Sequence, residues 1–492
     1  MRLHTRWVVL SSALLGTLFC SLTVTGQAAT AQPAWNADTL QQLHQIQQAA
    51  LRDDYAYQQT AHLTDNIGPR LAGSLQATGA VEYVAEEMRK LGLAVTLEKV
   101  IVPHWVRGEE RAELVSYPGQ VPGTHQKIVV TALASLNNAT PSEGITAEVV
   151  VVNSFDELDA LPREKVAGKI VVFNERFDHR MAAGGFALAA YGEAVAYREG
   201  GREHAAHQGA VAALVRSAGN ADFRLAHTGE TGYDPKLPSI PAAAITTEDA
   251  ELLARLSTQG PVRIHLVLTP QLLPDVVSYN VVADLKGSEH PEQVVIVSGH
   301  LDSWDLGTGA IDDATGVAVA METAQLLKHL HLQPKRTIRV VAWMAEEMGI
   351  FGGKAYAKQH APEVANHFAA IETDLGAGHA LGVNVAGDES MVQLLQPVAE
   401  VLQSSGAGVV RSSDETGADI IPLKVGGVPT FSPIQDIRKY FDYHHTAADT
   451  LDKVDPRELR ENAAVVAVLA YALATVNREL PRKPLAMPDW LK

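Results

Sequence analysis

The stretch VVIVSGHLDSWDLGTGAIDDATG, residues 294–316, decides the expected fold of this chain. It opens on a run of apolar or small residues, 294–298, that is typical of a strand buried on both faces. His300 and Asp302 follow directly, and the pair Asp312-Asp313 comes after a glycine-containing loop, just before an alanine- and valine-rich segment. Polar residues of metal-ligand type therefore stand between a strand and a helix, where open α/β sheets bind their ligands.

The alternation of strand and helix continues towards the C-terminus. The expected elements are a helix, a strand, a helix and a strand, at residues 314–330, 337–343, 350–359 and 368–372. A long helix with Asp455 as N-cap and Pro456 in its first turn ends the region. This pattern predicts an α/β fold over residues 276–492, with a mostly parallel sheet between layers of helices.

Acidic residues directly follow the later strands as well. Glu346 and Glu347 come after the second strand, and Asp374 comes after the third. If the strands are parallel neighbours, these carboxylates and His300 converge at one edge of the sheet, where their repulsion is costly without a cation. A metal site is the simplest interpretation.

The set of candidate ligands is completed by Asp312 and by His445 in the late segment YHHT, residues 443–446. Two imidazoles and three carboxylates without a thiolate suit zinc, and also manganese or cobalt. The set exceeds what one tetrahedral zinc with a bound water needs, and it fits two ions about 3.5–4 Å apart. Each motif alone is weak, because Asp312-Asp313 could simply cap the next helix. Their joint placement at strand ends favours a site.

Length and charge limit the classes of protein that remain. A chain of 492 residues predicts two or three domains. The formal charge of −17, from 40 basic and 57 acidic side chains, excludes nucleic acid and anionic membranes as expected partners.

Residues 1–31 are predicted to be a signal peptide. Arg2 and Arg6 precede an apolar run, residues 7–24, that ends at small residues. The run is short for a membrane span and no later apolar stretch is long enough for one, so no span is expected in the mature chain. The only cysteine, Cys20, lies in the predicted signal peptide, so the mature chain would have no disulfide. A secreted bacterial protein, periplasmic or extracellular, is expected.

The residue composition and the pattern of expected strands and helices divide the rest of the chain into two parts. Residues 32–110 are predicted as the N-terminal part of the main domain, beginning with a Gln- and Ala-rich segment, 32–62, that is either a pro-segment or a helix. An amphipathic helix is expected at 74–91. Residues 111–275 read as a separate strand-rich domain with one or two helices within 191–218. Four histidines there show no ligand spacing and are interpreted as ordinary surface or structural residues: His179, His204, His207 and His227. Asn138 fits the glycosylation acceptor pattern.

The motifs SGHLDSWD, IDDATG, WMAEEMG, IETDLGAG and YHHTAADT resemble, in order, the five ligand segments of the co-catalytic dizinc metallopeptidase family, of zinc aminopeptidase and glutamate carboxypeptidase type. The likeness runs from NIGPR at residues 66–70 to the C-terminal helix, and it includes His227-Thr228-Gly229. It implies a zinc-exopeptidase-like sheet between helices, and a β-rich protease-associated domain at 111–275.

The resemblance also implies residue roles. One zinc would bind His300, Asp312 and Asp374, and the other would bind Asp312, Glu347 and His445, with Asp312 as the bridge. His445 rather than His444 matches the family's ligand because a Thr follows it and Asp449 stands four residues later. Glu346 would be the general base, Asp302 would hold the His300 ring, and a cis peptide would join Asp312 to Asp313.

The expected activity is that of a secreted dizinc exopeptidase that cleaves short peptides, with unblocked dipeptides as substrates and a homodimer as the implied assembly. Two alternatives stay open: a single-zinc enzyme of glutaminyl cyclase type, and a non-catalytic binding protein of the transferrin receptor kind. Asp419, Lys424 and Tyr440 are either near the pocket or purely structural.

Overall fold

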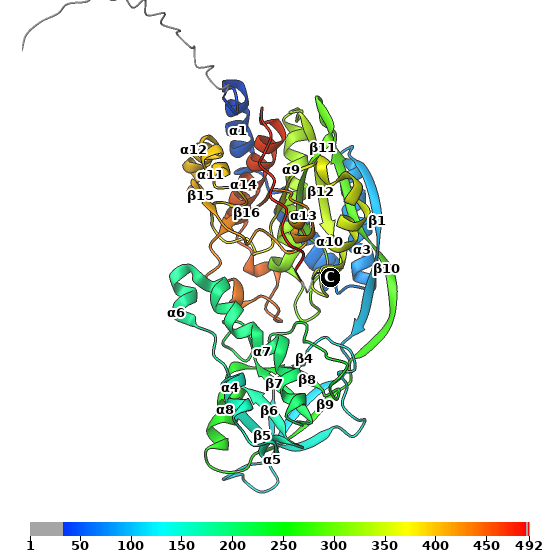
Figure 1. Ribbon diagram of the computed structural model, residues 1–492, viewed down its shortest axis with the longest axis vertical. Helices are drawn as coiled ribbons and strands as arrows, with labels where there is room; N and C mark the ends of the chain where they lie inside the picture. The colour runs from blue at the N-terminus through cyan, green and yellow to red at the C-terminus, as the bar shows by residue number, and fades with distance from the viewer. Residues whose placement is uncertain (1–32, 489–490, 492) are drawn as a thin grey trace, which may run out of the picture. The chain divides into compact units, whose positions relative to one another are not determined.

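The site-bearing sheet has eight strands in the order β1-β10-β12-β11-β13-β16-β14-β15 (Figure 1). The computed structural model describes residues 33–488 and 491, so the predicted signal peptide lies outside the described residues. The strand bounds are β1 Ala94–Val106, β10 Gln271–Leu285, β11 His290–His300, β12 Arg336–Trp343, β13 His367–Glu372, β14 Ala380–Ala386, β15 Val409–Ser412 and β16 Thr430–Gln435. Strand β11 is parallel to both of its neighbours, β12 and β13. Strand β10 is antiparallel to β1 and β12, and β14 is antiparallel to β16 but parallel to β15. The α/β prediction is confirmed, with a mixed sheet whose centre is parallel.

Both faces of this sheet are covered. Successive residues of β11 point to opposite sides, and each side packs into a core of its own. Val295 and Val297 belong to the larger core, which includes residues of α1 (Ala37–Ala50), α3 (Leu75–Lys90), α9 (Thr315–His329) and α14 (Pro456–Thr475). Val294 and Ile296 pack in a smaller core with residues of α10 (Phe351–Gln359) and α13 (Ile421–Val425). A strand buried on both sides must be apolar throughout, which explains the uninterrupted run that marked it in the sequence.

The N-terminal helix α1 is part of the larger core. The Asn36 side chain accepts a hydrogen bond from Thr39 N and caps the helix. Leu43 and Ile46 are fully buried, and the Trp35 indole donates a 2.8 Å hydrogen bond to the carbonyl of Ala472 in α14. A second short helix, α2 (Tyr55–Ala61), follows and packs against α9.

Glu322 in α9 is a buried carboxyl at this junction, and its Oε2 accepts a 2.8 Å hydrogen bond from Ala56 N. Burial, aided by Asp53 and Asp54, raises the pKa of Glu322 to about 8. Because the pKa is higher in the folded than in the unfolded chain, the stability that Glu322 contributes is present at low pH and is lost as the pH rises from about 4.5 to 8.

We therefore expect Glu322→Gln to raise the free energy of unfolding by about 2 kcal/mol at pH 8 and by much less at pH 5. Urea unfolding at the two pH values measures this difference. Glu86→Gln, at an exposed carboxylate on α3 that pairs with Lys90, is the matched control and should change both values by no more than about 0.5 kcal/mol. An equal gain for Glu322→Gln at both pH values would contradict the assignment.

A second eight-stranded sheet, in the order β3-β2-β9-β5-β6-β7-β8-β4, is built wholly from residues between β1 and β10. Its strands are β2 Glu110–Ser116, β3 Gln126–Ile128, β4 Val130–Ala132, β5 Ile145–Val152, β6 Ile170–Phe173, β7 Ala212–Arg216, β8 Ala242–Ile245 and β9 Arg263–Leu268. Its two long helices are α7 Ala187–His207 and α8 Thr247–Ser257. The segment is thus a strand-rich insertion into the first sheet.

The helix expected within residues 191–218 was placed too far along the chain. Helix α7 ends at His207, and Ala212–Arg216 forms strand β7. The run AALVR suits either element by composition, and its pairing with β6 and β8, which buries its first four residues, makes it a strand. The remaining short α-helices are α4 Phe155–Asp159, α5 Arg163–Val166, α6 His179–Met181, α11 Ser390–Leu394 and α12 Gln396–Leu402.

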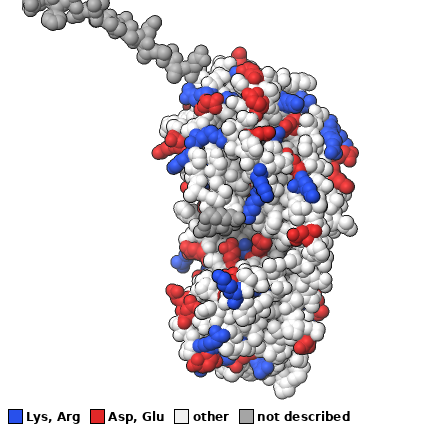
Figure 2. Space-filling model, turned by 45° about the vertical axis from the view of Figure 1, so that its right-hand side comes forward, with Lys and Arg blue, Asp and Glu red and all other residues white. Residues whose placement is uncertain are grey.

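Two surface expectations can be compared with the structure. Asn138 is buried, and its amide bonds to the main chain of Leu133 and Ala242, so the folded chain offers no glycan attachment there. Lys and Arg are interspersed with Asp and Glu over the face seen in Figure 2, so this face has no extended basic patch for a nucleic acid. Among the described residues, no helix combines the length and the apolar character that a membrane span requires.

Candidate active site

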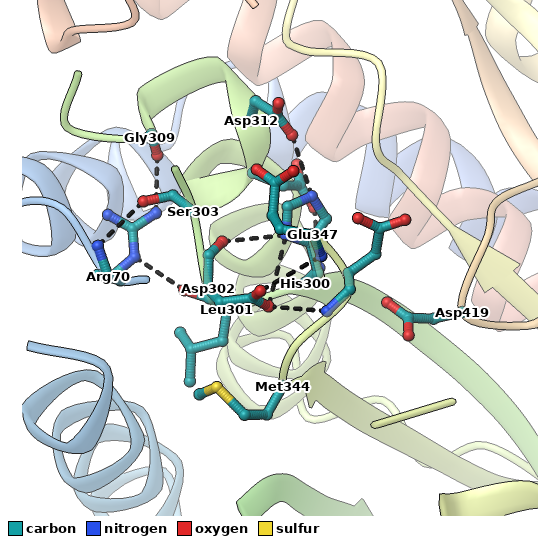
Figure 3. Close-up of polar contacts among 12 residues, drawn as sticks. Arg70, His300, Leu301, Asp302, Ser303, Gly309, Asp312, Met344, Glu347 and Asp419 are labelled. Atoms are coloured by element: carbon teal, nitrogen blue, oxygen red, sulfur yellow. Dashed lines mark hydrogen bonds and ion pairs between the residues drawn. The ribbon is translucent and has the colours of Figure 1, made fainter. Parts of the chain in front are cut away.

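The ends of three parallel strands bring the predicted ligands together. His300 ends β11 and pairs in register with Trp343 of β12, and Ser298 pairs with Glu372 of β13. The residues that follow these strands therefore emerge at one edge of the sheet. Figure 3 shows Asp312, Glu347 and His300 pointing toward one another at that edge.

These side chains form two overlapping groups. In the first, His300 Nε2 lies 3.0 Å from Asp312 Oδ1 and 3.2 Å from Asp374 Oδ1. In the second, His445 Nε2 lies 2.9 Å from Glu347 Oε2 and 3.4 Å from Asp312 Oδ2. The ligand atoms of each group all lie within 4.8 Å of one another, and Asp312 belongs to both.

The donor atoms fit metal ions. Asp312 Oδ2 and Glu347 Oε1 are buried and have no hydrogen-bond partner within the described part of the chain. Buried carboxylate oxygens are normally hydrogen-bonded, so orphaned ones that face a shared centre are expected when an ion is their partner. Nitrogen and carboxylate oxygen without thiolate suit zinc.

The charges of the site lead to the same conclusion. Burial and then the neighbouring carboxylates raise the pKa of Glu346 and of Glu347 well above the usual range. Burial by itself lowers the pKa of His300, but Asp374 and Asp312 raise it well above its ordinary value. Repulsion between the carboxylates therefore keeps some of them protonated. Only a positive charge among them lets all of them ionise near neutral pH.

Asp302 was expected to hold the His300 ring, and it does so with its main chain rather than with its carboxylate. The His300 ring contacts Asp302 through the main-chain carbonyl, with Nδ1 at 3.0 Å, whereas the Asp302 carboxylate is 3.9 Å away. That carboxylate instead accepts hydrogen bonds from Glu346 N at 3.1 Å and from Glu347 N at 3.3 Å. Figure 3 labels Asp302 and Glu347. If Nδ1 carries the ring proton and donates it to this carbonyl, Nε2 keeps its lone pair, which faces the carboxylates. Asp302 thus orients the ring with its backbone and anchors the Glu346-Glu347 segment with its side chain.

Asp313 joins the strand to the helix. The expected cis peptide between Asp312 and Asp313 is present. The Asp313 carboxylate accepts hydrogen bonds from His300 N at 3.0 Å and from Gly316 N at 2.9 Å. A Cβ atom on Gly299 would lie 2.5 Å from Asp313 Oδ2, and one on Gly316 would lie 2.3 Å from it, so this close approach requires glycine.

Arg70 and Asp449 support the loop that carries Asp312. The fully buried Arg70 guanidinium donates to the carbonyls of Leu301 at 2.8 Å and Gly309 at 2.8 Å, as seen in Figure 3. Asp449 accepts hydrogen bonds of 2.8 Å from both Ala310 N and Ile311 N, and burial raises its pKa to about 7. These contacts explain why NIGPR and YHHTAADT accompany the ligand motifs.

The inserted region supplies residues that the sequence interpretation missed. The Thr228 carbonyl lies 3.1 Å from His445 Nδ1, so a proton on Nδ1 can donate to it and leave Nε2 free for a ligand bond. His227, interpreted as an ordinary residue, is fully buried, and its Nε2 lies 3.2 Å from His444 Nδ1. The resemblance of His227-Thr228-Gly229 to the family was the one signal that could have found them. His444 Nε2 is 3.4 Å from Asp312 Oδ2, the same distance as His445 Nε2.

His227, His444 and His445 also form a third group of metal-ligand type. However, Arg198 Nη1 lies 3.2 Å from His445 Nδ1. The neighbouring guanidinium would repel a cation bound in this group. The three histidine rings are therefore expected to be neutral and without a metal ion. Burial, together with the charge of Arg198, lowers the pKa of all three histidines well below the ordinary value.

A cavity of about 930 Å³ opens onto the two metal-ligand groups. Its charged and polar lining comes from helices and loops of both the inserted region and the site-bearing region, and includes Arg198, Glu230, Glu346, Lys354 and Tyr440. Its apolar lining includes Trp105, Leu188, Leu272, Ile350 and Phe351. Of the residues left open by the sequence, Tyr440 lines the cavity, Asp419 is buried and accepts a hydrogen bond from Gly353 N, and Lys424 bonds to Asp414.

Comparison with known proteins gives the family. Residues 280–470 match the model of peptidase family M28. Carboxypeptidase Q of Homo sapiens is 40% identical over 429 residues, which are 87% of this chain and 87% of that protein. The chain belongs to peptidase family M28. As a member of this family it is a metallopeptidase, in agreement with the resemblance seen in its motifs.

Solved structures show that the fold is that of M28 peptidases. The M28 peptidase precursor of Shewanella amazonensis SB2B has a TM-score of 0.85 and 36% identity, and the match covers 91% of this chain and 99% of that one. An aminopeptidase from Aneurinibacillus sp. strain AM-1 has a TM-score of 0.61 at 23% identity, covering 91% and 99%, which is a likeness of fold.

Proposed function

We propose that the protein is a secreted dizinc exopeptidase that hydrolyses short peptides, with unblocked dipeptides as its substrates. The observation that carries the proposal is the pair of metal-ligand groups that share Asp312 and open, together with Glu346, onto one cavity. Two groups with a common carboxylate are what a co-catalytic pair of ions needs.

His300, Asp312 and Asp374 would hold one zinc ion, and Asp312, Glu347 and His445 would hold the other. Mn²⁺ or Co²⁺ are suitable substitutes because the ligands are oxygen and nitrogen only. When bound, the ions supply Lewis-acid chemistry: they make a shared water acidic and polarise the substrate carbonyl.

Glu346 is the proposed general base. It lines the cavity, and its main-chain N–H is held by the Asp302 carboxylate, which fixes the position of the side chain relative to the ligand Glu347. With cations offsetting the neighbouring carboxylates, Glu346 ionises, takes a proton from the attacking water, and returns it to the departing amine. Asp302 assists by holding this segment with its carboxylate and the His300 ring with its main-chain carbonyl.

The substrate class follows from the cavity and the relatives. The cavity offers both signs of charge, with Arg198 and Lys354 against Glu230, as a substrate with a free amine and a free carboxylate requires. Relatives include both carboxypeptidases and an aminopeptidase, YwaD of Bacillus subtilis, which is 22% identical over 454 residues. A single-zinc cyclase would need only one ligand group, and a binding protein would have no need of Glu346.

The remaining parts of the proposal concern location and assembly. Residues 1–31 would direct export, and residues 111–275 would form a protease-associated domain. A homodimer is proposed as well. Light scattering at working concentration tests the dimer, and a monomeric mass would exclude it.

A panel of dipeptides tests the function. The mature protein should cleave unblocked dipeptides at least tenfold faster than the N-blocked or C-blocked forms of the same sequence, because a blocked terminus leaves a charged group of the cavity unpaired. Chelation should abolish cleavage and zinc should restore it. Folded, zinc-loaded protein that cleaves none of the panel would refute the proposal.

A further inference from the structure

Glu230, in the inserted region, is a carboxylate of the cavity wall that has no direct partner. It lines the cavity of about 930 Å³, and within the described residues its side chain makes no hydrogen bond and no ion pair. Burial raises the pKa of Glu230 to about 7, although the charges of Arg198 and Lys354 lower it. These two cations therefore do not compensate for the burial of the carboxylate, and a positive charge that enters the cavity would do so.

The main chain on both sides of Glu230 is held in place beside the proposed metal centre. Thr228 N donates a 2.9 Å hydrogen bond to the carbonyl of the proposed ligand His445. Thr231 N donates a 2.9 Å hydrogen bond to the Ala134 carbonyl, and Ala134 pairs with Glu230 itself in an isolated β-bridge. The root of the Glu230 side chain is thus fixed relative to the metal-ligand groups, as a residue that selects substrates requires.

The part of the cavity wall next to the Glu230 carboxylate is formed by a glycine and an apolar side chain. Gly349 stands two positions after the proposed ligand Glu347, and a Cβ atom there would lie 3.9 Å from Glu230 Oε2 and 3.6 Å from the Phe351 ring. These are ordinary contact distances, so the space between them is open. Phe351 also lines the cavity and is 38% exposed. An apolar surface beside a carboxylate suits a ligand with an apolar stem and a cationic head.

A substrate carries two kinds of positive charge, and they lie at different distances from the reacting carbonyl. The free amine of a dipeptide is about 2.5 Å from the carbonyl carbon, because only Cα separates them. It therefore stays at the metal-ligand groups, where Asp374 and Glu346 already supply carboxylates. A lysine side chain carries its ammonium about 6 Å from Cα on a four-carbon stem. Glu230 belongs to neither metal-ligand group, so its place in the cavity matches this second kind of charge.

We propose that Glu230 binds the cationic side chain of a lysine or arginine in the substrate, and so makes basic dipeptides the preferred substrates. This inference rests on the proposed peptidase function and adds a side-chain preference to it. It gives Glu230 the side-chain cation of the substrate as its partner rather than the free amine. The charge-assisted hydrogen bond that forms in this way is worth about 10- to 100-fold in affinity.

The test compares dipeptides that contain lysine with dipeptides in which norleucine replaces it, because norleucine keeps the apolar stem and lacks the ammonium. Lys-Ala and Ala-Lys are both used, so that the result also shows on which side of the scissile bond the side chain is read. Binding is measured by calorimetry on zinc-loaded Glu346→Gln protein, in which hydrolysis does not interfere, and KM and kcat are measured on protein with Glu346. In at least one of the two positions, lysine should bind about 10- to 100-fold more tightly than norleucine.

Glu230→Gln should weaken binding of the lysine dipeptide by the same factor and leave that of the norleucine dipeptide unchanged. Glu164→Gln is the matched control, because Glu164 is an exposed carboxylate of the inserted region that does not line the cavity. It should keep the preference for lysine. Equal binding of lysine and norleucine dipeptides in both positions by the Glu230-intact protein would overturn the inference, and this comparison needs no Glu230 variant to fold. An equal loss of both dipeptides in Glu230→Gln, with a matching loss of zinc, would show a structural role instead.

An N-acetylated dipeptide distinguishes the side-chain cation from the free amine. Acetylation of Ala-Lys removes the charge of the amine and keeps that of the side chain, so Glu230→Gln should still weaken binding of the acetylated form. If the loss caused by Glu230→Gln were as large for Ala-Ala and disappeared on acetylation, the amine would be the partner of Glu230, and the inference would be wrong.

The outcomes separate this inference from the function on which it rests. Metal-dependent cleavage of lysine and norleucine dipeptides with equal KM would leave the peptidase standing and remove the role of Glu230. No cleavage of any of the dipeptides by folded, zinc-loaded protein would remove the peptidase itself.

Discussion

Replacing Glu346 by glutamine is expected to lower kcat about 10³-fold, within the range that positioned general bases contribute. Glutamine keeps the size and the main-chain bond to Asp302, but it cannot take a proton from water. Because Glu346 belongs to neither metal-ligand group, the zinc content should stay unchanged. The measurement is steady-state hydrolysis of an unblocked dipeptide, with zinc determined on the same sample by mass spectrometry.

Glu363→Gln is the control for this substitution, because its side chain is 66% exposed and outside the cavity. It should have the kinetics of the unmodified protein. If Glu346→Gln retained more than about a tenth of the activity at full zinc content, the base would have to be another group.

Replacing Asp312 by asparagine is expected to release both ions and to reduce activity by about 10³-fold or more. Asp312 presents Oδ1 to His300 and Oδ2 to His445, so it serves both groups, and a neutral amide cannot bridge two cations. Zinc per chain, measured after dialysis against trace metal, should fall from two to none.

Asp374→Asn is the matched comparison, because Asp374 belongs only to the His300 group. It should cost a single ion and leave the Glu347–His445 pair loaded. If the two variants lost the same amount of zinc, Asp312 would not be the bridge, and the two-ion arrangement would need revision.

The central fold could be predicted because its signals are local. The run 294–298 of strand β11 is buried on both faces, so it is uninterruptedly apolar, and the following α9 begins two residues after Asp313. The segment AALVR was the exception. Small apolar residues suit both a helix and a strand, and only the neighbouring strands β6 and β8 make it a strand.

Much of the candidate site was also visible, since four of the five proposed ligands lie within a few residues of a strand end or a helix start. Each ligand is a residue type with intrinsic metal affinity, which makes it recognisable. The contribution of Asp302 was only half predicted, because the sequence shows a carboxylate but not that the carbonyl of the same residue is what reaches the His300 ring.

The sequence by itself determined the strand-to-helix order, the ligand types, and the excess of carboxylates that calls for cations, because these depend on residue chemistry and local spacing. Only the tertiary structure decided that Arg198, His227 and Thr228, from an insertion with its own sheet, lie against His444 and His445. Such contacts join residues more than 200 positions apart, and no local pattern records them. Their physical cause is the packing of two separately built sheets, which leaves a buried guanidinium short of partners beside the proposed metal centre.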